Sequence, residues 1–156
     1  MDIKVLLKEY IDKNLEQIVF RKMAAADTLS LKEGSISDYV KNNQDDKAFQ
    51  KLLFEYIDKK NLKDSDVYNK VNIDRRLFSK IRSDENYHPS KNTVILLALS
   101  LELGEKEALK LLESASYYLP KNNIFDLIIR FCFINKIYNI NEVNELLYEY
   151  DCLLLN

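Results

Sequence analysis

The residues between Asp64 and Gly104 constrain the fold more than any other stretch of this sequence. Two short amphipathic runs, over residues 64–71 and 74–82, flank the polar corner Asn72-Ile73-Asp74. Asn72 can adopt the left-handed backbone conformation that a tight corner often requires, and Asp74 is a good N-cap for the second run. We expect Ile73 to fill the crevice between the two runs. The pattern predicts a helix-turn-helix, with an apolar supporting helix after the Pro89-Ser90 pair.

The rest of the chain has the composition of an all-α protein. Only two of its 156 residues are glycine and two are proline, and 47% are apolar. Many helix formers and few helix breakers favour helices joined by short connections. Apolar residues at helical spacing predict helices near 2–22, from 47, from 64 or 65, from 74, and over 91–103, 105–116, 123–137 and 141–150. Gly104 is the expected stop of the helix before it. We therefore expect a compact multi-helix bundle that contains the helix-turn-helix.

A polar segment separates the first predicted helix from the others. Residues 24–46 contain Gly34, a turn signal at 35–38 and the polar run 41–46. We place a domain boundary there, with residues 1–46 as an N-terminal helix plus linker. Residues 47–156 would then form a helical domain with the helix-turn-helix at about 64–104.

Basic residues gather in and around the second run of the corner. The whole chain has a formal charge of −2, whereas residues 70–91 contain six basic and three acidic residues, a net of +3. Arginine is well suited to a bidentate contact with guanine, and a positive patch on one face is typical of nucleic-acid binding. The alternative is an ordinary solvated helix face. The residues that we expect to contact nucleic acid are Arg75, Arg76, Ser79 and Lys80 in the groove, and Lys70, Arg82 and Lys91 on phosphates.

Residues 66–104 resemble the Cro/cI-type (XRE-like) helix-turn-helix family. The resemblance rests on Ile73, Ser79, Ile81, the Pro89-Ser90 pair and the Leu103-Gly104 pair, which occur in the family's order. This chain differs in having Tyr68 in place of alanine, Asn72 in place of the corner glycine, Arg82 in place of glutamate, and a longer loop at 83–88. The resemblance implies binding of double-stranded DNA. Tyr68 predicts that the two helices are pushed apart or that its ring swings outward.

Residues 49–155 resemble more closely a bacterial helical domain. That domain occurs alone behind a short N-terminal helix, or appended to macro-domain and von Willebrand A-type proteins. The resemblance rests on the strings at 67–82, 125–129 and 138–147 and covers about two-thirds of the chain. It implies a helix-turn-helix fold and a transcriptional regulator.

Residues with catalytic or metal-binding chemistry are sparse. His88 is the only histidine, so neither a histidine-based metal site nor a Ser-His-Asp arrangement has its components. We expect no enzyme, no cofactor and no metal. Cys132 and Cys152 cannot form a disulfide framework, and Cys132 is expected to be a buried free thiol. The N-terminus lacks the pattern of a secretory signal and no apolar run spans a bilayer, which predicts a cytoplasmic protein without a membrane segment.

Two functions follow from these patterns. The first is a DNA-binding transcriptional regulator that uses the helix-turn-helix, with a homodimer or protein contact through the N-terminal helix or the C-terminal helices. The alternative is a protein-interaction, adaptor or inhibitory module built on a degenerate helix-turn-helix that recognises no operator. A continuous positive face along the second run favours the first function. Burial of Arg75 and Arg76 in carboxylate pairs favours the second.

Overall fold

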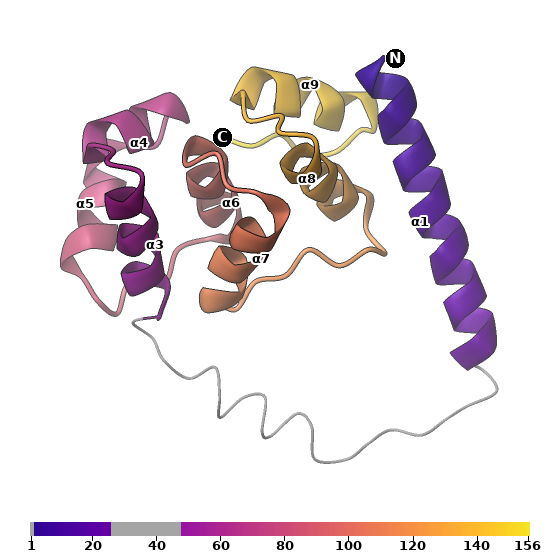
Figure 1. Ribbon diagram of the computed structural model, residues 1–156, viewed down its shortest axis with the longest axis horizontal. Helices are drawn as coiled ribbons and strands as arrows, with labels where there is room; N and C mark the ends of the chain where they lie inside the picture. The colour runs from indigo at the N-terminus through magenta and orange to yellow at the C-terminus, as the bar shows by residue number, and fades with distance from the viewer. Residues whose placement is uncertain (1, 26–47) are drawn as a thin grey trace.

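The computed structural model of the protein describes residues 2–25 and 48–156 (Figure 1). All regular elements in those two ranges are helices, and the predicted all-α class is confirmed. They are α1 (Ile3–Ala25), α3 (Ala48–Lys59), α4 (Asp64–Lys70), α5 (Arg75–Ser83), α6 (Lys91–Ser100), α7 (Glu105–Ser114), α8 (Ile124–Ile134) and α9 (Ile140–Glu149). The predicted linker lies outside the described residues, except that α1 continues to Ala25. The domain boundary near residue 46 therefore remains a prediction.

The helices form a bundle with α6 and α7 at its centre. Helices α3, α4 and α5 lie on one side of this pair, and α8, α9 and α1 lie on the other (Figure 1). Helix α4 packs on α5 and α6, α7 packs on α3, α6 and α8, and α8 packs on α1 and α9. One hydrophobic core includes Leu7 of α1, Leu97 of α6 and Leu147 of α9. The candidate corner thus sits at one end of a continuous core that holds it in place.

Helix α6 is the central element because its side chains are apolar on all sides. Every residue from Val94 to Ser100 is buried, as expected for a helix without a polar face. The hydroxyl of Ser100 donates a hydrogen bond to the carbonyl of Val67 in α4, at 2.5 Å. This bond satisfies a polar group inside the core and joins α4 to its supporting helix.

Side-chain caps begin five of the helices. A side-chain oxygen of each capping residue accepts a hydrogen bond from a backbone N–H in the first turn, as N-caps do. The five caps are Asp2 for α1, Asp74 for α5, Ser90 for α6, Asn123 for α8 and Asn139 for α9. The cap predicted for α4 at Asp64 or Ser65 is wrong. Helix α4 already begins at Asp64, and Lys63 precedes it without a side-chain bond.

Six of the helices are each followed by a residue other than glycine whose backbone adopts the left-handed conformation. The backbone φ of these residues lies between 52° and 65°, and they are Asn61, Asn72, Glu102, Ser116, Lys136 and Asp151. In each case the N–H of the next residue donates to the carbonyl five residues before it, at 2.9–3.2 Å, which closes a Schellman motif.

Gly104, the predicted stop of α6, is instead the N-cap residue of α7. Glu102 ends α6, so the helix stops three residues before the predicted Leu103.

Helix α1 packs on the bundle through its N-terminal half. Leu7 and Ile11 are buried against the core, and the ring of Tyr10 lies 5.6 Å from the ring of Phe131 in α8. The buried amide of Asn14 donates to the carbonyl of Tyr10 at 2.7 Å. No helix within the described ranges is long and apolar enough to cross a membrane.

Candidate nucleic-acid interface

The corner between α4 and α5 has the predicted backbone. Asn72 adopts a φ of 58°, and the N–H of Ile73 bonds the carbonyl of Tyr68 at 2.9 Å. Ile73 is 7% exposed and belongs to the core, as predicted for the residue that fills the crevice. An asparagine thus serves where a glycine is more usual, because asparagine tolerates the left-handed region better than most residues.

Aromatic packing holds α4 and α5 together at this corner. The Tyr68 ring lies 5.4 Å from the Phe78 ring at a tilt of 46°, and Phe78 meets Phe54 of α3 edge-on at 6.2 Å. Tyr68 is half-buried against the core, as is Leu77 of α5. The Tyr68 ring therefore does not swing out to solvent. Its bulk instead forms part of an aromatic cluster shared by three helices.

The structure brings four of the seven candidate residues together on one exposed face of α5. With 3.6 residues per turn, Ser79 projects between Arg75 and Arg76, and Lys80 projects beside Arg76. All four are exposed, whereas Phe78 occupies the opposite, buried face. Within the described ranges, no hydrogen bond or ion pair engages the side chains of Arg75, Arg76 or Lys80. As far as the described residues go, the three cations on this face are therefore available to an anion.

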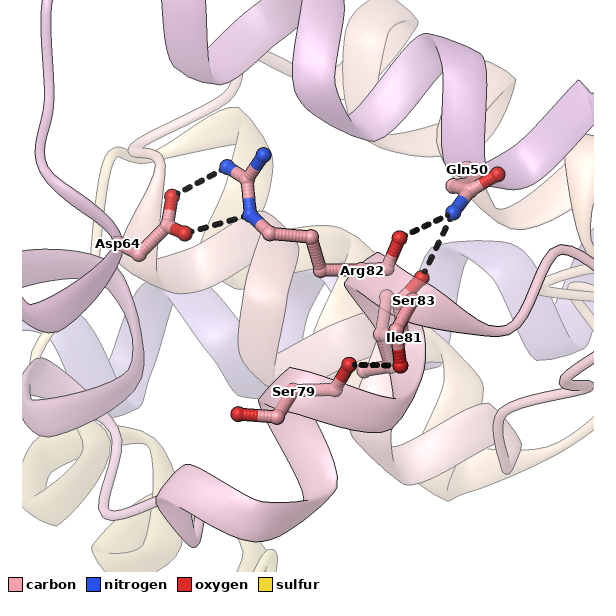
Figure 2. A network of polar contacts seen from close by, with 6 residues as sticks. All are labelled: Gln50, Asp64, Ser79, Ile81, Arg82 and Ser83. Atoms are coloured by element: carbon pink, nitrogen blue, oxygen red, sulfur yellow. Dashed lines mark hydrogen bonds and ion pairs between the residues drawn. The ribbon is translucent and has the colours of Figure 1, made fainter.

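Arg82 lies on the same helix but is held by other helices (Figure 2). Its Nε and Nη2 atoms donate to the two carboxylate oxygens of Asp64, each at 2.6 Å. The guanidinium carbon lies 4.2 Å from the centre of the Phe54 ring, which is cation–π geometry. The Gln50 amide of α3 donates to the carbonyls of Arg82 at 2.7 Å and of Ile81 at 3.1 Å. Arg82 thus joins α3, α4 and α5.

Lys70 and Lys91, the other two predicted phosphate contacts, are engaged in ion pairs with acids from distant parts of the chain. Lys70 Nζ lies 2.7 Å from Glu102, and this hydrogen bond lowers the pKa of the Glu102 carboxyl. Lys91 Nζ lies 2.7 Å from the carboxylate of Asp126 in α8, which is buried. These two lysines lie on the C-terminal end of α4 and the first turn of α6, not on the exposed face of α5.

Asp126 pairs with Lys91 and not with Arg130, which lies four residues further along α8. The i,i+4 spacing of Asp126 and Arg130 favours an ion pair between them. Instead, Arg130 donates to the Glu105 carboxylate at 3.2 Å and to the Leu119 carbonyl at 2.7 Å. Both residues pair with other elements instead, because the packing of the helices places those partners within reach.

The net charge of +3 over residues 70–91 therefore overstates the free positive charge of this region. Asp64, Glu102 and Asp126 all lie outside that stretch of sequence, yet each pairs with a basic residue inside it. Among the described residues, the cations that remain unpaired are the three on the exposed face of α5. The positive charge is therefore more localised than the count along the chain predicts.

The residues that hold α5 in place have weak sequence signals or none. Phe54 shows the spacing of a core residue, and the only signal at Asp64 is that of an acid at the start of a helix. Gln50 carries no signal, because a polar residue on a helix surface is ordinary. Its role depends on the end of α5, 31 and 32 positions away along the chain.

The loop after α5 packs on the bundle. The His88 ring lies 5.4 Å from the Tyr117 ring, and the Tyr117 hydroxyl donates to the carbonyl of Pro89 at 2.8 Å. Tyr87 is half-buried against the core. Residues 2–25 and 48–156 contain no group of three or more His, Cys, Asp or Glu residues placed to hold a metal ion.

The chain matches no family model, no curated protein and no solved structure. Its functional assignment therefore depends on the residues and the geometry described above.

Proposed function

We propose that this protein binds double-stranded DNA through α5, as a helix-turn-helix transcriptional regulator. The observation that carries the proposal is a set of three cations, Arg75, Arg76 and Lys80, on the exposed face of a firmly packed helix, none of them paired within residues 2–25 and 48–156. The resemblance of residues 66–104 to XRE-like proteins supports the same proposal.

The positions of these side chains suit a helix that enters a major groove. In helix-turn-helix proteins the N-terminal residues of the second helix contact base edges. Arg75 and Arg76 are the first two residues of α5, and Asp74 uses its side chain to cap the helix rather than to neutralise them. Ser79 is small, so it allows the middle of the helix to approach the bases closely.

The engaged cations limit the expected affinity. Lys70, Arg82 and Lys91 are held by carboxylates, so only three of the six basic candidates, all on α5, have no ion-pair partner among the described residues. Each phosphate neutralised contributes about −0.9 to the slope of log K against log salt concentration, which predicts a slope of about −3. We therefore expect weak, salt-sensitive binding to non-specific duplex and tighter binding only to a preferred sequence.

Titration of a mixed-sequence 20-base-pair duplex at 50 and 200 mM salt tests the proposal. The double variant Arg75→Ala with Arg76→Ala is expected to lose most of the binding at 50 mM salt. A matched control is Lys106→Ala with Lys110→Ala on α7, which removes the same charge from two other exposed positions. Absence of binding by the native protein at 50 mM salt contradicts the proposal, and so does an equal loss in both double variants.

One observation favours a protein contact as a second candidate function. Val19, Phe20 and Met23, in the C-terminal half of α1, are 58%, 73% and 69% exposed. Large apolar side chains grouped on one exposed segment are typical of a contact surface. Sedimentation of the native protein and of a Phe20→Ser with Met23→Ser variant tests self-association. A native protein that stays monomeric over the whole concentration range argues against a homodimer through α1.

A further inference from the structure

Arg82 belongs by its helical position to the exposed face of α5. It lies two turns beyond Arg75, and 3.6 residues per turn place the two side chains within about 20° of each other around the helix axis. Half of the Arg82 side chain is exposed. From helix geometry alone it would be the fourth cation of this face.

Contacts with α3 and α4 prevent the Arg82 guanidinium from acting as a fourth free cation on this face. The planar fork of arginine fits a carboxylate or a phosphate in the same bidentate way. Asp64 already occupies Nε and Nη2, and the Phe54 ring covers one face of the guanidinium plane. Figure 2 shows the side chain running from the end of α5 towards Asp64, while Gln50 holds the Arg82 carbonyl.

We propose that Asp64 withholds Arg82 from nucleic acid, so that the Asp64–Arg82 pair sets how many cations α5 presents to DNA. Arg82 is then a positioning residue: it fixes the end of α5 against α3 and α4 and does not touch the phosphates. This inference rests on the proposed DNA binding by α5. Asp64, an acid on the preceding helix, then helps to set how strongly α5 binds duplex DNA of any sequence.

The consequence is a defined gain of binding when the carboxylate charge is removed. In Asp64→Asn the side chain keeps its size, but a backbone phosphate becomes the stronger partner for the guanidinium. One additional phosphate contact raises affinity for mixed-sequence duplex about eightfold at 100 mM salt and steepens the salt slope by about 0.9. Discrimination between sequences should fall, because phosphate contacts carry no sequence information.

Three variants separate this mechanism from a general change of charge. Asp66→Asn removes one negative charge two residues further along α4, where the acid is exposed and makes no ion pair with Arg82. Asp64→Asn combined with Arg82→Gln removes the cation that would be released. Arg82→Gln alone should leave the native salt slope unchanged, which a direct phosphate contact would not allow. Circular dichroism and urea denaturation establish that each variant is folded.

The measurement is the affinity for a mixed-sequence 20-base-pair duplex between 50 and 200 mM salt. A steeper slope in Asp64→Asn that is absent from both Asp66→Asn and the double variant supports the proposal. If the native protein binds and Asp64→Asn gains no more than Asp66→Asn, this inference is wrong and DNA binding stands. If neither the native protein nor Asp64→Asn binds duplex, both fail.

Discussion

Arg82 and Asp64 lie 18 positions apart in the sequence, and two hydrogen bonds of 2.6 Å join them. The pair ties the last turn of α5 to the first turn of α4, across the corner that positions α5. Because the guanidinium also lies on the Phe54 ring, three helices meet at one side chain. Arg82 and Asp64 thus hold α5 in place, whereas Arg75, Arg76 and Lys80 lie on its exposed face.

Replacement of Arg82 should lower stability through the loss of this junction. A half-exposed ion pair and a cation–π contact each contribute up to about 1 kcal/mol, so we expect Arg82→Ala to lower the free energy of unfolding by about 1–2 kcal/mol. Arg82→Lys keeps the charge but loses the planar fork, and it should recover less than half of that loss. Urea denaturation of both variants provides the measurement. Full recovery by lysine would show that charge alone matters at this position.

Lys80 and Lys70 should differ in their contribution to DNA binding, although both are exposed lysines. Lys80→Gln removes a cation that has no ion-pair partner in the described part of the chain, and it should reduce the magnitude of the salt slope by about 0.9. Lys70→Gln removes a cation that is already paired with Glu102, so the slope should stay within error of the native value. The slopes come from duplex titrations at four salt concentrations. Equal effects of the two substitutions would argue against a role for tertiary ion pairing.

Replacing Lys91 alone should lower the free energy of unfolding more than replacing both members of its ion pair. Lys91→Met leaves the Asp126 carboxylate buried without its cation, which should lower stability by about 2–4 kcal/mol. Lys91→Met combined with Asp126→Leu removes that buried charge and should be less destabilised than the single variant. Urea denaturation of the single and double variants measures this coupling. Simple additivity of the two changes would mean that the pair contributes little.

A glycine at Lys136 should stabilise the protein. Lys136 has a φ of 56°, and the left-handed conformation costs a residue with a side chain about 1–2 kcal/mol. Glycine adopts this conformation freely but loses about 0.5–1 kcal/mol more in chain entropy, so Lys136→Gly should gain about 0.5–1 kcal/mol. Lys136→Ala is the control, because it removes the same side chain and keeps the strain. Equal stabilities of the alanine and glycine variants in thermal or urea denaturation would contradict backbone strain at Lys136.

The two cysteines should differ in reactivity. Burial, with a smaller contribution from Glu142, raises the pKa of the Cys132 thiol to about 12, and burial also raises the pKa of half-buried Cys152. At pH 8 a disulfide reagent should therefore modify Cys152 slowly and Cys132 only after unfolding. Rapid modification of both thiols in the folded protein would show that α8 opens locally.

The raised pKa of Cys132 also predicts a loss of stability at high pH. The unfolded thiol ionises near 9 and the folded thiol near 12, so the unfolded state is favoured increasingly as pH rises through that window. Cys132→Ala should show a shallower decline of the free energy of unfolding between pH 9 and 10.5. Parallel declines in the two proteins would mean that other groups account for the effect.

Most of the secondary structure could be predicted from the sequence because its causes are local. The caps at Asp74 and Ser90 and the left-handed Asn72 depend on side chains within a few residues of the backbone groups they satisfy. Helix ends were less predictable. Glu102 is not glycine, yet its conformation ends α6, because the buried Leu103 that follows it favours the turn.

The candidate site could be predicted only in part, for a related reason. Helical spacing identifies Arg75, Arg76, Ser79 and Lys80 as one face, and the structure places them so. The same spacing assigns Arg82 to this face, and only the neighbouring helices remove it. No pattern along the chain identifies Gln50 as the residue that holds the end of α5.

By itself the sequence determined the all-α class, the position of the corner, and an apolar helix that begins at Lys91. These features follow from periodicity, capping and composition, which act over one or two helical turns. Only the tertiary structure decided which cations are paired with carboxylates. Lys70, Arg82 and Lys91 find their carboxylates 32, 18 and 35 positions away, and charges pair through space according to how the helices pack.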